Sequence, residues 1–565
     1  MKNIRFFTIN FKIGVTSLLL ITCILGSIDK GKNHVLFLMQ TGEVEKSIEK
    51  FISYCSKEKI ADLETLQQMC YILMKKGIDT NDIETQLLSI FGSGIAQSKH
   101  SLEIIEKGLQ SNDAQVQLVA LHFLSQYPED RVDNLLIQAM SSDYLQIRVE
   151  AAYILASRKH PSAVGQIESL MQKLPYFFRP YFPKLFAISG TAEATASLKK
   201  LMSDPYPITR VQAIISAALT NRDDLIDLIR KAASHTNIAE QEISAFALGI
   251  LKDSKSYKVL KHLSKSPDQN VRLAAYKSLY SLGETSYGDK IKKMALGLNV
   301  FAINALAEVE NSENTLLVLC KSTNFQVRIN AMLSLLKRKD SRCVGFLKEF
   351  FVSDTKDIAY QISHSLGYAH SAIKPISSSS QRLKDPTLDL SLSLNLKQAY
   401  LREVLELEEG ALLEVARFIF SNSQNNLVPL LVSLLENKQS PATILLLKEY
   451  TKKAGAPFIR DYCHLALFRM NEGKEHEAYI RGWLLRQNHN ELIRLQPYLS
   501  FSVRPEKTKY DLDTDEKSRL LIDIYLSLAS KQDEMSIYSV LNAMKKGNPK
   551  NCYVLAGILI LACSH

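Results

Sequence analysis

Val271-Arg272-Leu273-Ala274-Ala275-Tyr276-Lys277-Ser278-Leu279 is the segment that decides the fold, because its pattern recurs along the chain. Steps of 31 residues back from Arg272 reach a long polar residue each time, namely Gln241, Arg210, Arg179, Arg148 and Gln117. The positions one before, three after and seven after each of these are mostly apolar, as Val271, Ala275 and Leu279 are here. These offsets lie on one face of an α-helix. The sequence therefore repeats one helix with one buried stripe.

A turn and another helix precede each copy of this segment. Ser266-Pro267-Asp268 is typical of a helix start, with Asp268 able to cap the backbone N–H groups that follow it. Leu102–Leu109 has the apolar spacing of a first helix, and Ser111–Val116 leads from it into the next second helix. A fixed period in this range indicates stacked repeats. We therefore predict an all-α fold, an α-solenoid (superhelix) of helix-turn-helix repeats of about 31 residues.

The pattern Asp-x-x-Val-Arg-x-x-Ala-x-x-x-Leu at 268–279, and its variant with Asn at 324–335, resembles the HEAT repeat. The short period is similar to the HEAT-like repeats of phycobilin lyases, here in a chain of exported bacterial type. The resemblance implies that second helices line a concave surface and that turn aspartates and helix arginines form a ladder between repeats. Gln117 and Gln241 would interrupt that ladder, and Ala359 would end it. Its expected members are Asp143, Arg148, Asp204, Arg210, Asp268, Arg272 and Arg328.

The first residues have the features of an export signal. A basic lead (Lys2, Arg5 and Lys12) precedes the apolar run 13–25, which is shorter than a membrane span. Residues 1–27 are therefore predicted to be a signal peptide cleaved after Gly26 or Ser27, a lipoprotein signal with the lipid on Cys23, or an uncleaved anchor. A buried first helix is the remaining alternative. Export places the protein in the periplasm or cell envelope.

Pattern changes divide the rest of the chain. Residues 31–97 are predicted to form a helical N-terminal cap, and 98–370 a regular array whose last second helix carries Ile358, Ile362 and Leu366 on its apolar face. A Ser-rich linker is expected at 371–395, with 388–394 as an extended connector. Degenerate repeats follow at 396–499, and a C-terminal helical cap at 512–565. The apolar run 554–562 is too short for a bilayer, so we expect a buried helix there.

Two segments are candidates for binding a partner. The first, 174–183, combines three prolines with five aromatics; it is either a packed kink between repeats or an exposed aromatic patch. Pro180 and Pro183 require its helix to start late. The second is a basic run, which is either a solvated turn or a contact for an acidic partner. The candidate residues are Tyr176, Phe177, Arg179 and Tyr181 in the first segment, and Lys337, Arg338 and Lys339 in the second.

The sequence contains no Gly-rich phosphate loop, no G-x-S-x-G and no H-E-x-x-H. The pair His364 and His370 and the pair His464 and His476 lack the spacing of ligands on one helix, and the eight cysteines are scattered. A net charge of +10 from 69 basic and 59 acidic residues is too dispersed for a nucleic-acid site. We therefore predict no catalytic, cofactor-binding or metal-binding residue.

These observations favour a non-enzymatic exported scaffold that binds protein partners on the concave face of the solenoid. One alternative is an accessory or regulatory subunit of an envelope or secretion enzyme complex, including a HEAT-like lyase. Another is a structural protein that tethers the membrane to the envelope.

Overall fold

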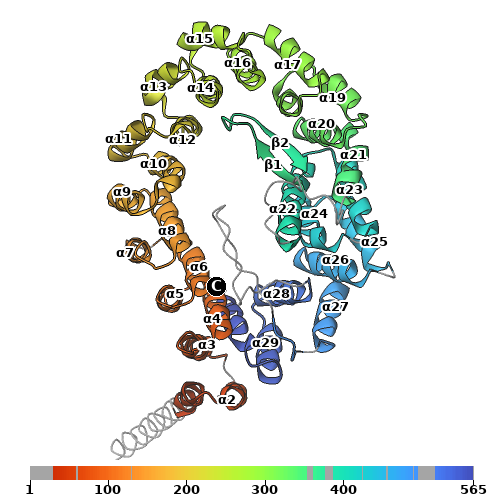
Figure 1. The fold of residues 1–565 in the computed structure, drawn as a ribbon. Helices are drawn as coiled ribbons and strands as arrows, with labels where there is room; N and C mark the ends of the chain where they lie inside the picture. Colours follow the sequence, from red (N-terminus) through yellow and green to blue (C-terminus); the bar gives the residue numbers. More distant parts are fainter. Residues whose placement is uncertain are drawn as a thin grey trace, which may run out of the picture. The chain divides into compact units, whose positions relative to one another are not determined.

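A computed structural model describes residues 30–58, 61–128, 130–352, 360–375, 386–422, 424–453, 456–487, 489–493 and 516–563. These residues are almost all helical, as the sequence predicts (Figure 1). They fall into two compact units, which are described separately. Unit 1 contains residues up to Ala151 together with those from Ile480 onward, and unit 2 contains Ala152–Tyr479. The predicted signal segment and Cys23 lie outside the described residues.

Unit 1 brings the predicted N-terminal and C-terminal caps together, because helix α30 packs against α3 and α4. Asp82 caps the start of α4, and Asp113 caps the start of α6. The helices of this unit are 30–41, α2 (Val44–Glu58), α3 (Leu63–Ile78), α4 (Ile83–Ala96), α5 (Ser101–Leu109), α6 (Ala114–Leu124), α7 (Asp130–Ala139), α28 (Glu516–Ala529), α29 (Glu534–Lys546) and α30 (Asn551–Cys563). Helices α8 (Leu145–Ser157) and α27 (Lys474–Leu485) contain the boundaries between the units.

Helix α30 confirms the expected buried terminal helix. Val554, Ile558 and Leu559 have at most 1% of their surface exposed. Gly557 permits close packing, since a Cβ atom there would lie 2.0 Å from the backbone oxygen of Gly92 on α4. In the described part of the chain, no helix combines the length and apolar character that a bilayer crossing requires.

Unit 2 consists mainly of helix pairs in two layers. Figure 1 shows second helices such as α12 and α14 on the inner side of the arc that this unit forms, with first helices such as α11 and α13 outside. The pairs are α9 (Ala163–Lys173) with α10 (Phe182–Ser189), α11 (Ala192–Leu201) with α12 (Pro207–Leu219), α13 (Ile226–Ala232) with α14 (Ile238–Ile250), α15 (Tyr257–Leu263) with α16 (Gln269–Ser281), α17 (Ser286–Leu296) with α18 (Val300–Ala305), and α19 (Glu313–Leu319) with α20 (Phe325–Lys337).

The predicted stripe is buried in each repeat. Ala213, Ala275, Ala217, Leu248 and Leu279 all have 0% of their surface exposed. A single helix pair could not bury such a stripe alone, so each repeat depends on its neighbours for its core.

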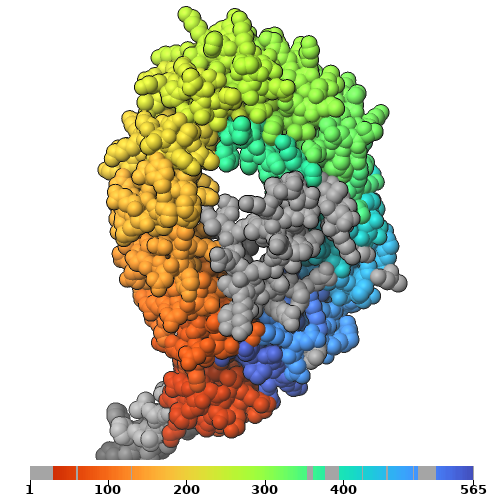
Figure 2. All heavy atoms as spheres, viewed as in Figure 1, coloured from red at the N-terminus to blue at the C-terminus, as the bar shows by residue number. Residues whose placement is uncertain are grey.

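The structure contradicts the prediction of a second helix around Ile362 and Leu366. An antiparallel hairpin of β1 (Tyr360–His364) and β2 (Ser371–Pro375) forms there instead, and Ile358 and Ala359 lie outside the described residues. In Figure 2 the hairpin lies against the inner layer of unit 2. Gly367 allows its turn to approach α14, since a Cβ atom would lie 2.6 Å from the Ala239 backbone oxygen. Asn304, Asn330 and Glu242 of the inner layer form hydrogen bonds with backbone groups of the hairpin. In a helix most of these backbone groups would instead be bonded to each other.

The expected extended connector at 388–394 is also wrong, because α22 (Pro386–Val404) covers it. Pro386 is the first helical residue, where its missing N–H has no intrahelical partner. The linker residues 376–385 lie outside the described residues. The other helices of unit 2 are α21 (Val344–Val352), α23 (Glu409–Ser421), α24 (Val428–Lys438), α25 (Pro441–Thr451) and α26 (Pro457–Arg469).

Candidate functional site

Most of the long polar residues of the 31-residue register close the turns of their own repeats. Five of them, counting Arg328, donate a side-chain hydrogen bond to the backbone carbonyl six residues earlier, whereas Arg148 and Arg179 make no such bond to a described residue. Arg210 reaches Asp204 O at 2.6 Å, Arg272 reaches Ser266 O at 2.6 Å, and Arg328 reaches Ser322 O at 2.9 Å. Gln117 and Gln241 make the same bond at 2.6 Å, so the glutamines continue this pattern rather than interrupt it.

Some of these residues also bind the next repeat. Ser142 donates to the side chain of Gln117 at 2.7 Å, and Arg179 donates to the Asp204 carboxylate at 2.9 Å. Arg210 forms an ion pair with Glu240. The Arg179–Asp204 link joins an arginine to an aspartate of the next repeat, whereas Arg210 binds a glutamate of the next repeat.

The other two expected aspartates do not bind an arginine in the part of the chain that the structure describes. The Asp268 carboxylate caps its own helix through the N–H groups of Asn270 and Val271. Asp143 and Arg148, both described in the structure, form no ion pair with each other. Arg210, Arg272, Arg328 and Asp268 thus hold turns or helix ends in place, whereas no such contact to a described residue exists for Asp143 or Arg148.

Segment 174–183 is partly a core element and partly an exposed surface. Tyr176–Tyr181 forms a 3₁₀ helix, and α10 starts at Phe182 with Pro183 in its first turn, as the prolines predict. Phe182 is buried, whereas Tyr176, Phe177 and Tyr181 are 42%, 63% and 51% exposed. Tyr206, at the start of α12, is 44% exposed, and its ring lies 5.6 Å from that of Tyr176 in an edge-on arrangement. We call Tyr176, Phe177, Tyr181 and Tyr206 the aromatic cluster.

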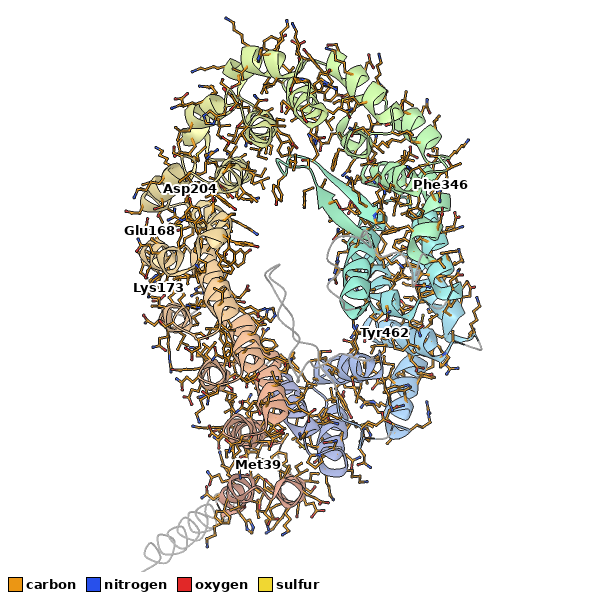
Figure 3. The ribbon with its side chains drawn as sticks, viewed as in Figure 1. Met39, Glu168, Lys173, Asp204, Phe346 and Tyr462 are labelled. Carbon is orange, nitrogen blue, oxygen red and sulfur yellow. The ribbon has the colours of Figure 1, made fainter. Side chains whose placement is uncertain are left out.

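Asp204 fixes the orientation of this cluster. It lies at the turn between α11 and α12 (Figure 3) and is only 4% exposed. Its carboxylate accepts hydrogen bonds from the Tyr176 hydroxyl at 2.6 Å, the Tyr206 N–H at 2.9 Å and Arg179 at 2.9 Å. The Arg179 guanidinium lies 4.6 Å from the centre of the Tyr176 ring, within range of a cation–π interaction. Burial alone raises the pKa of Asp204, but these donors outweigh it and lower that pKa below its ordinary value.

The basic run has partners within the chain. Arg338 donates to Glu313 and, at 2.9 Å, to the backbone oxygen of Val309, while Lys339 lies 2.9 Å from Glu406. Lys337 lies 3.4 Å from the side-chain oxygen of Asn304. Because acidic groups already neutralise part of this run, the aromatic cluster is the better candidate for a partner contact.

Two histidines that the sequence separates by a turn meet in the structure. The Nδ1 atoms of His464 on α26 and His476 on α27 lie 2.9 Å apart, and the Tyr479 ring stacks on His464 at 3.6 Å. Burial, followed by the charges of His476 and Arg460, lowers the pKa of His464 to about 4. One nitrogen must donate and the other accept. The pKa values of both His464 and His476 are lowered, mainly by burial, which favours two neutral rings near pH 7. The spacing of twelve residues hid this contact, because it matches no single-helix pattern.

The described residues offer little that resembles a reaction centre. A shallow groove of about 530 Å³ is lined by Lys348, Gly410, Glu414, Arg417, Phe418 and Ser421. Within the described ranges, no three His, Cys, Asp or Glu side chains are placed to hold a metal ion. Six of the seven described cysteines are buried; burial raises the pKa of Cys320 to about 12.

Comparison with known proteins supports the repeat architecture. Residues 195–280, which contain α12, α14 and most of α16, match the family described as HEAT repeats. This part of unit 2 therefore consists of HEAT repeats. No curated protein sequence matches it.

Several solved structures resemble this chain at low identity. The complex of CpcE and CpcF of phycocyanin lyase from Nostoc sp. PCC7120 is 16% identical over 44% of this chain and 94% of that one, with a TM-score of 0.24. Kap121p bound to Ste12p is 13% identical over 91% of this chain and 62% of that one, with a TM-score of 0.34. UNC-45 from Drosophila melanogaster is 11% identical over 91% and 79%, with a TM-score of 0.28. At these values the similarity concerns the fold alone.

Proposed function

We propose that this helical-repeat protein is a non-enzymatic scaffold that binds a protein partner through the aromatic cluster and the adjoining inner layer of unit 2. The exposure of Tyr176, Phe177 and Tyr181 carries the proposal, because large aromatics held at a surface are typical of the residues that dominate protein interfaces. Asp204 orients Tyr176 and Tyr206 before any partner arrives. A partner therefore need not supply the free energy that would order these two side chains.

The test is crosslinked pull-down from the native cell with matched variants. Phe177→Ala and Tyr181→Ala remove exposed rings for which the structure gives no hydrogen bond to described residues. Leu219→Ala is the control, because Leu219 is 68% exposed at the far end of α12. We expect a protein captured by the wild type and by Leu219→Ala to be lost with the ring variants. Equal capture by all variants would refute the cluster as the binding site.

Arg179→Glu is a poor test of direct contact. Arg179 is bound to Asp204, so a carboxylate at position 179 would repel Asp204 and disturb the whole cluster. A loss of binding in that variant would not separate a lost contact from a lost structure.

The proposal includes export, with residues 1–27 as the signal and Cys23 as the candidate lipid attachment site. The basic lead and the apolar run support it. Fractionation of the wild type and Cys23→Ser tests it. Release of only the variant from the membrane fraction indicates a lipid anchor, and a cytoplasmic location of both would refute export.

A further inference from the structure

The hairpin in unit 2 has one edge that is bound to the inner helices and one edge whose backbone has no partner among the described residues. Asn330 on α20 binds the backbone of Ile373 twice, donating to its carbonyl at 2.9 Å and accepting from its N–H at 2.9 Å. Asn304 on α18 donates to the Ser371 carbonyl at 2.6 Å. These carbonyl and N–H groups of β2 therefore point away from β1 and toward the helices.

The register fixes where the backbone groups of β1 point. Ile362 lies opposite Ile373, and His364 lies opposite Ser371. In an antiparallel pair, opposite residues alternate between bonding to each other and pointing away from each other. Since Ile373 points away from β1, the N–H and C=O of Ile362 must point away from β2, to the outer edge.

The outer edge has no partner in the part of the chain that is described. Although α22 contacts β1, the structure shows no backbone hydrogen bond from Ile362 or His364 to a described residue on that side. Ile362 is 51% exposed and Leu366, in the turn, is 75% exposed. Backbone donors and acceptors therefore lie beside exposed apolar side chains.

The hairpin is also held rigidly at its turn. The Glu242 carboxylate on α14 accepts hydrogen bonds from the Ser365 hydroxyl and, at 3.1 Å, from the Gly367 N–H. The His370 ring lies 3.0 Å from the Asn270 carbonyl, and both Glu242 and His370 are buried. A strand fixed along its inner edge and at its turn presents the other edge in a constant position, which lowers the entropic cost of adding a strand.

We propose that the outer edge of β1 binds an extended segment of a partner protein, which adds a strand to the hairpin and places apolar side chains against Ile362 and Leu366. The unpaired backbone groups dictate an extended occupant, because only a strand offers N–H and C=O groups at the matching spacing. The exposed side chains dictate apolar residues at alternate positions of that segment. The inference rests on the proposed protein-binding function and specifies the conformation of the bound segment.

The test uses a displayed library of ten-residue peptides selected on the full chain, followed by fluorescence anisotropy with the selected peptides. Ile362→Pro removes the outward N–H, and proline is tolerated at a free strand edge. Ile362→Ala is the matched control, because it also shortens the side chain but keeps the N–H. We expect Ile362→Pro to weaken binding about tenfold, and Ile362→Ala about threefold or less. Hydrogen exchange at the Ile373 amide verifies that the hairpin persists in both variants.

Three results would overturn the proposal. They are equal binding by the two variants, failure to select any peptide, and a dimer that dissociates only in Ile362→Pro, which would assign the edge to a second copy of the chain. The peptide-binding measurement on the Ile362 variants is independent of the pull-down with Phe177→Ala. A partner captured through the aromatic cluster while no peptide binds β1 would refute only this inference.

Discussion

Asp204 is the side chain on which the geometry of the aromatic cluster depends, so its removal should have a measurable cost. Asp204→Ala deletes a buried acceptor that serves Tyr176, Arg179 and the Tyr206 N–H. Tyr176 and Arg179 are partly exposed and regain contacts with water, so the loss should be less than that of three fully buried bonds. We expect the free energy of unfolding to fall by about 2 kcal/mol, which is typical of the loss of one hydrogen bond to a buried charged group. Asp204→Asn keeps an oxygen for the Tyr206 N–H and should cost about 1 kcal/mol.

Urea unfolding followed by far-UV circular dichroism measures these costs, and near-UV circular dichroism reports the tyrosine packing. The lowered pKa of Asp204 gives a second readout, since a group whose pKa is lower in the folded state stabilises the fold at pH values above its unfolded pKa. The difference between wild type and Asp204→Ala should therefore disappear as the pH falls through the folded pKa. A difference below about 0.5 kcal/mol at pH 7, with an unchanged tyrosine spectrum, would refute the role of Asp204.

Three further predictions concern other parts of the chain. Asn330→Ala should speed hydrogen exchange of the β2 amides and lower the unfolding free energy by about 2 kcal/mol, because Asn330 makes two bonds to Ile373. Asn304→Ala loses one bond to the hairpin and should cost about 1 kcal/mol; equal effects would contradict the role of Asn330 in holding β2. Gly557→Ala should lower the Tm because its Cβ would meet the backbone of α4, whereas Gly165→Ala, with open space around it, should not. The pKa of His464 is about 4 in the folded protein, below the ordinary 6.5, so unfolding takes up a proton between these values. The free energy of unfolding should therefore decrease as the pH falls from 6.5 to about 4. His464→Gln should reduce this pH dependence in unfolding measurements.

The sequence could predict the helical repeats because their signal is local. A stripe at fixed offsets from Arg272 needs no knowledge of distant contacts, and burial of Ala275 and Leu279 follows from it. The late start of α10 also followed from Pro180 and Pro183 alone.

The hairpin could not be predicted in the same way, because its cause lies far away in the sequence. Ile362 and Leu366 fit a helical face by spacing, but Glu242 and Asn330 bind the backbone of this region in an extended form. The separation between Glu242 and Gly367 is 125 residues. For the aromatic cluster, the residue types were visible, whereas exposure and the role of Asp204 depended on which side chains the next repeat placed beside them.

The contact between α30 and α4 has a consequence for how unit 1 is made. Lys550, just before α30, forms an ion pair with Glu84, which lies 466 residues earlier. During synthesis, α3 and α4 leave the ribosome long before α30, the helix that packs against them. Their apolar surface stays available to chaperones throughout that interval, and unit 1 can reach its final form only after residues 551–563 have been released.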